Sequence, residues 1–189
     1  MTLNAQGLTK RFDGRPVIEC FSFSFPARGL FALVGESGRG KTTLLYMLAG
    51  LLLPDEGTVT GNRPLSISFQ EYRLFPYMTA LDNVLCVQRT RHPDRACALL
   101  RSVGLTDEEM LYYPSMLSGG MKQRVSLVRA LASDAPLVLL DEPIKELDPQ
   151  IQQRVIELLR EQAAERLLIV TAHSEAEAAR LGAQPIVLS

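Results

Sequence analysis

The sequence predicts an α/β fold, in which a mainly parallel sheet carries an inserted helical subdomain. The apolar runs LFALVG, LVLL and RLLIVTAH have the composition of strands buried on both faces, and helical stretches separate them. Near the N-terminus, VIECFSFSF instead alternates apolar and polar residues, as a strand with one buried face does. Buried strands joined by helical crossovers predict a parallel sheet covered on both faces.

The first third of the chain contains several strand candidates and the first helix. Phe21, Phe23 and Phe25 alternate with serines, so they are expected to face a core. LFALVG then enters a glycine loop, and the apolar spacing from Lys41 to Ala49 becomes helical, with Gly50 marking its end. GTVTG and LSISFQ are short strand candidates.

The middle of the chain, residues 72–133, is predicted to be helical. Thr79 can cap one helix, Pro93 begins a second, and Thr106 forms a capping box with Glu109. We therefore treat residues 1–189 as a single domain. An α/β body comprises residues 1–71 and 134–189, and the helical subdomain comprises residues 72–133.

The α/β pattern returns after residue 133. LVLL ends in two acids, and Asp148 before Pro149 is a typical helix start. RLLIVTAH ends in His173, Ser174 can cap the following helix, and PIVL is the last strand candidate. Because ligands of parallel sheets bind beyond the carboxyl ends of the strands, the polar residues at those ends are the candidates for chemistry.

Composition narrows the class of protein. The net charge is −1, and the basic stretch RTRHPDR lacks interleaved aromatic residues, so no nucleic-acid partner is expected. Cys20, Cys86 and Cys97 have no metal or redox spacing and are expected to be small buried residues of a cytosolic protein. The residues MTLNAQGLTKRF do not have the apolar stretch of a signal peptide, and no run approaches the ~20 apolar residues of a membrane span. We expect the chain to reach a membrane only through a partner.

GESGRGKT, residues 35–42, matches the phosphate-binding loop and has a strand before it and a helix after it. Its glycines allow backbone N–H groups to converge on a β-phosphate, Lys41 can contact the β- and γ-phosphates, and Thr42 can bind Mg²⁺. The alternative is a glycine turn without function, which the flanking elements disfavour. The predicted nucleotide-binding residues here are Gly35, Glu36, Ser37, Gly38, Arg39, Gly40, Lys41, Thr42 and Thr43.

Two acids at the end of LVLL are candidates for catalysis. Asp141 can complete a magnesium shell, and Glu142 can accept a proton from the water that attacks the γ-phosphate. Gln70 ends LSISFQ and can bridge magnesium and that water, and His173 can donate a hydrogen bond to a γ-phosphate oxygen. Each has a plainer alternative, a polar surface residue or a structural histidine. Phe12 is either a platform for adenine or a core residue of the first strand.

A second candidate anion site lies in LSGGMKQR, residues 117–124. Ser118 stands at an N-cap position, and Gly119 and Gly120 leave the first backbone N–H groups of the helix unshielded. The N-terminus of a helix carries about half a positive charge, which favours an anion. A capped helix with nothing bound is the alternative.

Taken together, these motifs resemble those of ABC transporter ATP-binding subunits, which have a P-loop NTPase (RecA-like) fold. The resemblance implies that the α/β body of residues 1–71 and 134–189 also carries a small antiparallel β lobe. GESGRGKT resembles Walker A, LVLLDE Walker B, LSGGMKQR the signature, Gln70 the Q-loop glutamine, KELD the D-loop and His173 the switch histidine. The order and rough spacing agree over nearly the whole chain. FQEYRLFPYMTALDNV and LSGGMKQRV further resemble importers of the nitrate/sulfonate/taurine group.

This resemblance implies an ATPase that uses ATP and Mg²⁺ at the cytoplasmic face of the membrane, as a peripheral protein. Two copies would pair head to tail, so that Ser118, Gly119 and Gly120 of one contact the γ-phosphate bound by the other. Residues 70–84 would receive a coupling helix of integral membrane permease subunits, and a solute-binding protein would take part indirectly. Hydrolysis would open the dimer and switch the permease.

The chain departs from the family pattern in three places, and two other classes of function stay open. Only 19 residues separate Gly50 from Gln70, Lys145 and Glu146 stand where small residues are usual, and Ser174 replaces a common acid. One alternative is a soluble ABC-type ATPase that acts on nucleic acid or ribosomes, which would resemble a tandem cassette or carry a coiled coil. The other is a small-molecule kinase, which would leave LSGGMKQR unexplained.

Overall fold

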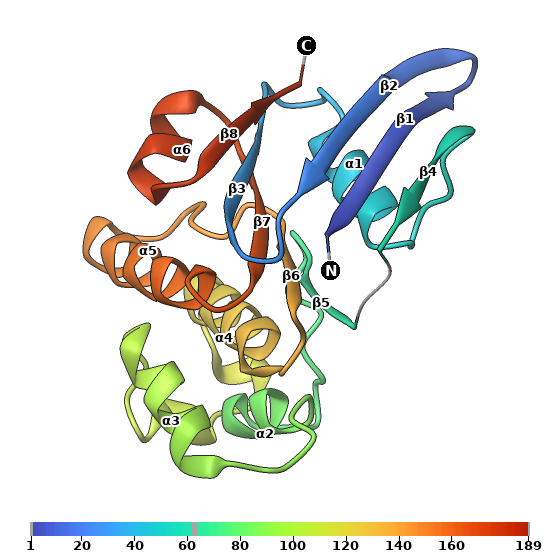
Figure 1. Ribbon diagram of the computed structural model, residues 1–189. Coiled ribbons are helices and arrows are strands. Elements are labelled where there is room, and N and C mark those ends of the chain that lie inside the picture. Colours follow the sequence, from blue (N-terminus) through green and yellow to red (C-terminus); the bar gives the residue numbers. More distant parts are fainter. Residues whose placement is uncertain (1, 62–63, 189) are drawn as a thin grey trace.

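The computed structural model describes residues 2–61 and 64–188 (Figure 1). The outermost residues of the predicted domain, 1 and 189, lie outside this part. The strands are β1 (Leu3–Phe12), β2 (Arg15–Phe25), β3 (Gly29–Val34), β4 (Glu56–Thr60), β5 (Leu65–Ser68), β6 (Leu137–Leu140), β7 (Leu167–Ala172) and β8 (Gln184–Val187). The helices are α1 (Lys41–Leu48), α2 (Ala80–Leu85), α3 (Pro93–Ser102), α4 (Gly119–Ala132), α5 (Pro149–Ala163) and α6 (Glu175–Leu181). Two 3₁₀ turns, Glu109–Leu111 and Pro114–Met116, precede α4.

The strands form two sheets of opposite character. The larger sheet has the order β5-β6-β7-β3-β8, and its neighbouring strands are parallel. The smaller sheet has the order β2-β1-β4 and is antiparallel. The predicted parallel sheet and antiparallel lobe are therefore both confirmed.

The register of the larger sheet aligns the carboxyl ends of four strands. Val34 pairs with Ala172, and Ser68 pairs with Leu140. Because Leu140 also pairs with Val170, the residues that follow β3, β5, β6 and β7 lie along one edge. Gly35, Asp141 and His173, which follow strands of the larger sheet and have predicted chemical roles, are therefore on this edge.

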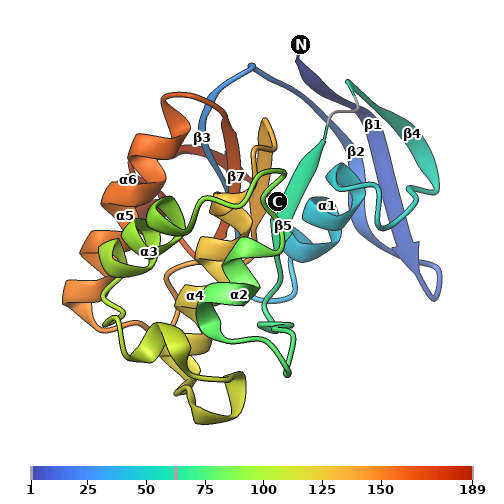
Figure 2. The same ribbon diagram turned by 90° about the horizontal axis from the view of Figure 1, so that it is seen from below.

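Alternate residues of β3 face two different cores. Leu30, Ala32 and Val34 belong to the core that the sheet shares with α2 to α6, whereas Phe31 and Leu33 belong to the core shared with α1 and the β lobe. Figure 2 shows α1 and the lobe on one side of the larger sheet and α3, α4 and α5 on the other. The loop before α1 and the start of α4 therefore belong to opposite layers.

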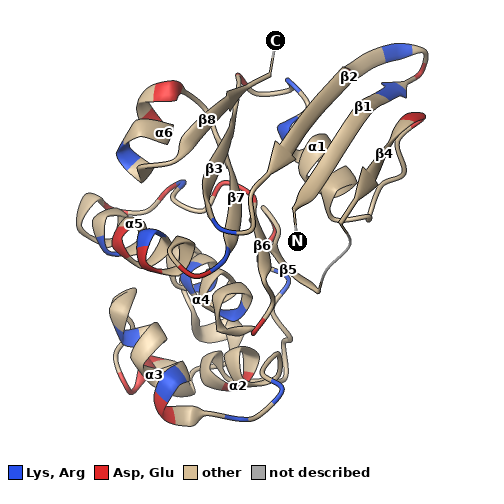
Figure 3. Ribbon diagram, viewed as in Figure 1, with Lys and Arg blue, Asp and Glu red and all other residues tan. Residues whose placement is uncertain are grey.

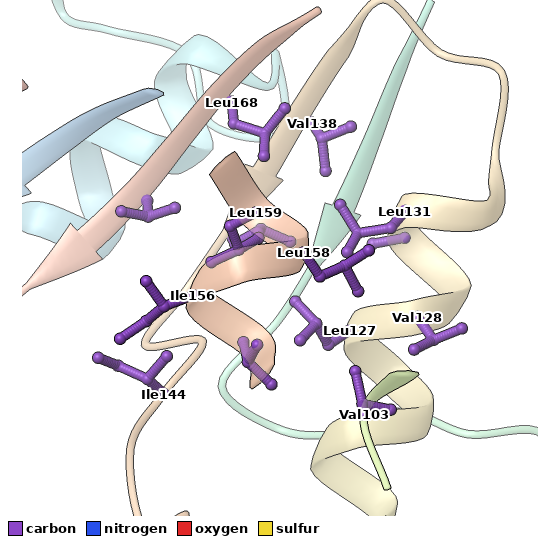
Figure 4. Close-up of a cluster of buried hydrophobic side chains, with 14 of the residues drawn as sticks. Val103, Leu127, Val128, Leu131, Val138, Ile144, Ile156, Leu158, Leu159 and Leu168 are labelled. Atoms are coloured by element: carbon purple, nitrogen blue, oxygen red, sulfur yellow. The ribbon is translucent and has the colours of Figure 1, made fainter. Parts of the chain in front are cut away.

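The core around α4 and α5 joins the helical segment to the sheet. Leu127, Val128 and Leu131 of α4 pack near Leu158 and Leu159 of α5 (Figure 4). Fully burying each such side chain contributes about 1.5–3 kcal/mol. Because this cluster extends to the strands β6 and β7, the helical segment shares its core with the sheet.

Most expected helix starts have the capping bonds that the sequence predicts. The side chains of Thr79, Ser118, Asp148 and Ser174 each accept a hydrogen bond from a backbone N–H group in the first turn of the following helix. In the capping box, the backbone N–H of Thr106 donates to Glu109 Oε2 at 2.8 Å, and the N–H of Glu109 donates back to Thr106 Oγ1 at 3.2 Å. This box begins a 3₁₀ turn rather than an α-helix.

The prediction of buried cysteines is wrong. Cys20 and Cys86 are exposed, and Cys97 is half-buried. Cys20 lies at an irregularity in the pairing of β1 with β2 and has a φ of 47°, so it departs from the regular in-and-out alternation of the strand. Cys86 follows the last residue of α2. Phe25, in contrast, is fully buried, as predicted.

Candidate active site

The loop between β3 and α1 folds around the ammonium group of Lys41. Lys41 Nζ donates to the carbonyl oxygens of Gly35 at 2.7 Å and Glu36 at 2.9 Å, and its side chain is buried. Gly38 and Gly40 have φ values of 83° and 81°, which lie in a backbone region that residues other than glycine rarely adopt. The backbone of this loop therefore curves around the Lys41 ammonium, as the glycine-rich sequence predicts.

Gly40 is also required for close packing. A Cβ atom at this position would lie 2.8 Å from Val17 Cγ1 and 2.9 Å from the carbonyl oxygen of Val17. Strand β2 thus rests directly on the loop, and the antiparallel lobe is fixed to the candidate nucleotide site.

Asp141 is held between two threonine hydroxyl groups. Thr42 Oγ1 donates to Asp141 Oδ2 at 2.9 Å, and Thr171 Oγ1 donates to Asp141 Oδ1 at 2.8 Å. Burial raises the pKa of Asp141, and the two hydroxyl bonds oppose this rise. The sequence reasoning missed Thr171, although a hydroxyl residue within the apolar run LLIVTA was the available signal.

The oxygen atoms around Thr42 fit a hard divalent cation. A hydroxyl and a carboxylate lie side by side, and both are ligand types that Mg²⁺ prefers. Within residues 2–61 and 64–188, no group of three or more His, Cys, Asp or Glu side chains forms a metal cluster. Magnesium beside a nucleotide usually takes one or two ligands from the protein and the others from phosphate and water. Gln70, the third predicted ligand, is exposed at the same edge.

Both carboxylate oxygens of Glu142 are engaged by neighbouring side chains. His173 Nε2 lies 3.0 Å from Glu142 Oε1, and Lys145 Nζ lies 2.7 Å from Glu142 Oε2. Gln70 Nε2 is 3.5 Å from the same Oε2 atom. Glu142 has a φ of 50°, and such strain in a residue other than glycine is often found at functional sites.

One cavity brings together most of the predicted site. It is lined by Phe12, Val17, Ser37, Gly38, Gly40, Lys41, Thr42, Thr43, Gln70, Glu142, Lys145 and His173. Phe12 is 47% exposed, so the alternative that it is a core residue is wrong. Gly35, Glu36 and Arg39 belong to the loop but do not line the cavity, and Asp141 is buried beside Thr42. Lys145 was not among the predicted site residues.

The signature residues do not line this cavity. Ser118 Oγ accepts a hydrogen bond from the backbone N–H of Met121 at 3.3 Å, so Ser118 caps α4 as predicted. A Cβ atom on Gly119 would approach no atom more closely than 3.6 Å, and one on Gly120 none more closely than 3.9 Å. Unlike Gly40, these two glycines are not required by the packing of their own chain.

A family model described as ABC transporter matches residues 18–145. The chain belongs to the ABC transporter family. An aliphatic sulfonates import ATP-binding protein of Paraburkholderia xenovorans is 40% identical over 192 residues, covering 100% of this chain and 77% of that protein. A sulfate/thiosulfate import ATP-binding protein of Rhizobium meliloti is 36% identical over 212 residues, and here the chain spans only 58% of the relative's length. A thiamine import ATP-binding protein of Photobacterium profundum is 39% identical over 80% of this chain and 70% of its own length.

Two solved structures of this family have the same fold. A dimeric ATP-binding cassette in a post-hydrolysis state, bound to ADP and Pi, has a TM-score of 0.86 and 25% identity, over 99% of this chain and 94% of its own. A dimeric bacterial ABC transporter cassette has a TM-score of 0.83 and 28% identity, over 98% and 94%. The predicted P-loop NTPase fold is confirmed.

Proposed function

We propose that this chain is the ATP-binding and ATP-hydrolysing subunit of an ABC transporter and that it powers import of a solute across the cytoplasmic membrane. The main support is the cavity in which the loop around Lys41 faces the Glu142 carboxylate. The relatives described above are named as import ATP-binding proteins of sulfonate, sulfate and thiamine systems, which supports the direction of transport.

The cavity has the groups needed to bind ATP. The Lys41 ammonium would contact the β- and γ-phosphates, and the N–H groups of the loop would converge on the β-phosphate. The exposed ring of Phe12, which lines the same cavity, would stack on adenine. The further residues proposed to bind ATP are Gly35, Glu36, Ser37, Gly38, Arg39, Gly40, Thr42 and Thr43.

Magnesium would be held by Thr42, Asp141 and Gln70. When bound, the ion supplies positive charge that neutralises the phosphate oxygens. The hydrogen bond between Thr42 and Asp141 already places these two ligands together. Burial raises the pKa of Asp141, and a cation bound beside it would offset this effect and favour the charged carboxylate.

Hydrolysis would use Glu142 as the general base. The oxygen of a water molecule forms a bond to the γ-phosphorus, and the bond from that phosphorus to the bridging oxygen breaks, giving ADP and phosphate. Glu142 accepts the proton that the water loses, and Gln70 orients this water. His173, 3.0 Å from Glu142 in the free chain, would donate a hydrogen bond to a γ-phosphate oxygen.

A second copy of the chain would complete each site. Ser118, Gly119 and Gly120 lie outside the cavity of their own chain, and their glycines leave the helix start open. An anion at this helix terminus would be stabilised by its backbone N–H groups. A head-to-tail dimer places these groups on the γ-phosphate of the partner, and the related structures are described as dimeric.

The transporter would further comprise integral membrane permease subunits and, indirectly, a solute-binding protein. Among the helices of the described residues, none is long and apolar enough to cross a membrane. We place the chain at the cytoplasmic face as a peripheral subunit, with the segment that follows Gln70 as the permease-docking surface. In that segment Phe75 is 50% exposed and Tyr77 is 92% exposed. We also propose that residues 72–133 form a helical subdomain inserted in an α/β body.

Charge does not favour the alternative of a nucleic-acid partner. Both acidic and basic residues lie on α3 and on α5 (Figure 3), and the net charge is −1. A protein that binds the nucleic-acid backbone usually has a surface rich in Lys and Arg.

The proposed function is tested by phosphate release from ATP. The purified chain is expected to release phosphate with magnesium present. Glu142→Gln should bind ATP but release phosphate about 100-fold more slowly or slower still, since general-base catalysis contributes about 10²–10⁴-fold. Lys41→Ala should lose ATP affinity. Co-purification with a multi-span membrane protein would support the transport role. Equal phosphate release by the wild type and Glu142→Gln would contradict the proposal.

A further inference from the structure

Lys145 brings a second ammonium group to the candidate active site. The sequence has four lysines, Lys10, Lys41, Lys122 and Lys145. Two of them, Lys41 and Lys145, line the same cavity. Lys41 has a role in phosphate binding, but nothing in the proposed mechanism uses Lys145.

Lys145 contacts one of the two carboxylate oxygens of Glu142, the proposed general base. Its Nζ atom lies 2.7 Å from Glu142 Oε2, while His173 occupies Oε1 at 3.0 Å. An ammonium at 2.7 Å occupies one of the lone-pair sites of Glu142 Oε2, so fewer sites stay open to a water proton. The ion pair therefore competes directly with general-base action.

This ion pair is weak enough to be broken during turnover. The Lys145 side chain is 39% exposed, whereas the Glu142 side chain is 14% exposed. Partly exposed ion pairs contribute little because water screens them. The hydrogen bond to Glu142 raises the pKa of Lys145, so the lysine keeps its charge at neutral pH.

Glu142 does not need Lys145 to stay in place. Its backbone N–H donates to Thr171 Oγ1 at 2.8 Å, and its carbonyl oxygen accepts from Gln123 Nε2 at 3.2 Å. These bonds join Glu142 to β7 and α4. Shortening the Lys145 side chain would free one carboxylate oxygen and leave the backbone of Glu142 anchored.

We propose that Lys145 is a positioning residue that restrains ATP hydrolysis by holding Glu142 Oε2. This inference rests on the proposed function, because it requires Glu142 to be the general base. Removal of the lysine side chain is expected to raise kcat and leave KM for ATP unchanged, since the contact is to Glu142 and not to a group that binds nucleotide.

The test compares steady-state phosphate release by the full chain and its variants over a range of ATP and protein concentrations. Lys145→Met and Lys145→Gln should raise kcat about two- to fivefold, the size expected for the loss of one partly exposed ion pair, with KM within about twofold of wild type. Lys145→Arg restores the ion pair and should return kcat to the wild-type value. Arg101→Ala is the matched control, because Arg101 forms an ion pair of 2.7 Å with Asp107, away from the cavity.

Three results would overturn the inference: an unchanged or lower kcat in both Lys145→Met and Lys145→Gln, a raised KM, or an equal rise in Lys145→Arg. In the Glu142→Gln background, Lys145→Met should give no increase, and an increase there would also overturn it. Failure of the proposed function would give a different result: the wild type would release no phosphate, or would release it at the same rate as Glu142→Gln.

Discussion

Thr171 Oγ1 donates a hydrogen bond to Asp141 Oδ1 at 2.8 Å, and the same hydroxyl oxygen accepts the backbone N–H of Glu142, also at 2.8 Å. One side chain of β7 thus fixes the proposed magnesium ligand and the proposed general base, which are adjacent residues after β6. This contact explains how two acids with different roles keep fixed positions at the end of a short strand.

Replacing Thr171 tests this arrangement. Thr171→Val removes the hydroxyl group from a fully buried position and leaves a backbone N–H and a carboxylate oxygen without this partner. We expect the free energy of unfolding to fall by about 1–3 kcal/mol and phosphate release to fall with it. Thr171→Ser, which keeps the hydroxyl, should retain most of both. Denaturant unfolding and phosphate release measure the two effects, and a fully active, equally stable Thr171→Val would contradict the assignment.

The raised pKa of Asp141 predicts a particular pH dependence of stability. An acid with a raised pKa favours the folded state at low pH, and this contribution is lost as the pH rises through the folded pKa. Asp141→Asn removes the buried charge, so above that pKa it should raise the Tm of the nucleotide-free chain by about 2–4 °C, the shift produced by about 1 kcal/mol.

The gain in Tm of Asp141→Asn should shrink as the pH falls from the raised pKa of Asp141 toward the ordinary pKa of an aspartate, because the wild-type side chain then becomes neutral as well. The variant should also lose phosphate release, because it lacks the proposed metal ligand. Thermal unfolding from pH 4 to pH 8 measures the difference. A gain that grows toward low pH would show that the pKa of Asp141 is lowered rather than raised.

A substitution at Gly119 should affect the proposed dimer site without destabilising the fold. The space around Gly119 accepts a Cβ atom, and alanine is favoured over glycine in helices. Gly119→Ala should therefore leave the free energy of unfolding unchanged or raise it by up to about 1 kcal/mol, while the rate of phosphate release falls. Gly40→Ala should instead destabilise the chain, because its Cβ would lie 2.8 Å from Val17. Normal phosphate release by Gly119→Ala would argue against a partner phosphate at this helix start.

Phe12 should matter for nucleotide affinity and little for stability. If its ring stacks on adenine, Phe12→Ala should weaken ATP binding by about 1–3 kcal/mol, by analogy with base–aromatic stacking. Because the residue is 47% exposed, the Tm should change little. Tyr113→Ala removes an aromatic ring with the same exposed fraction and serves as the control. Isothermal titration with ATP measures the affinity, and equal affinities of the two variants would exclude stacking by Phe12.

The sequence was sufficient to predict the features that depend on backbone pattern. Apolar runs located β3, β6 and β7, and the alignment of parallel strands then required Gly35, Asp141 and His173 to share an edge. N-cap residues predicted the helix starts, because the side chain of each cap bonds to a backbone N–H group only two or three residues away.

Other features depend on side chains that meet across the fold, so pattern alone could not predict them. Thr171 is 30 positions from Asp141 along the chain, and no periodicity marks the bond between them. The conformation of the loop after Glu142 determines which atom Lys145 reaches. The pairing irregularity at Cys20 likewise depends on the match between β1 and β2.

The measurement that tests the central proposal most directly is phosphate release by mixed dimers of Ser118→Arg and Lys41→Ala chains. Each variant alone should be inactive, because one lacks the proposed partner contact and the other lacks phosphate binding. In a mixed dimer, one site combines an intact loop with an intact Ser118 of the partner, so mixing should restore part of the activity. Absence of any restored phosphate release, with mixed dimers demonstrated by differential tags, would contradict a site shared between two chains.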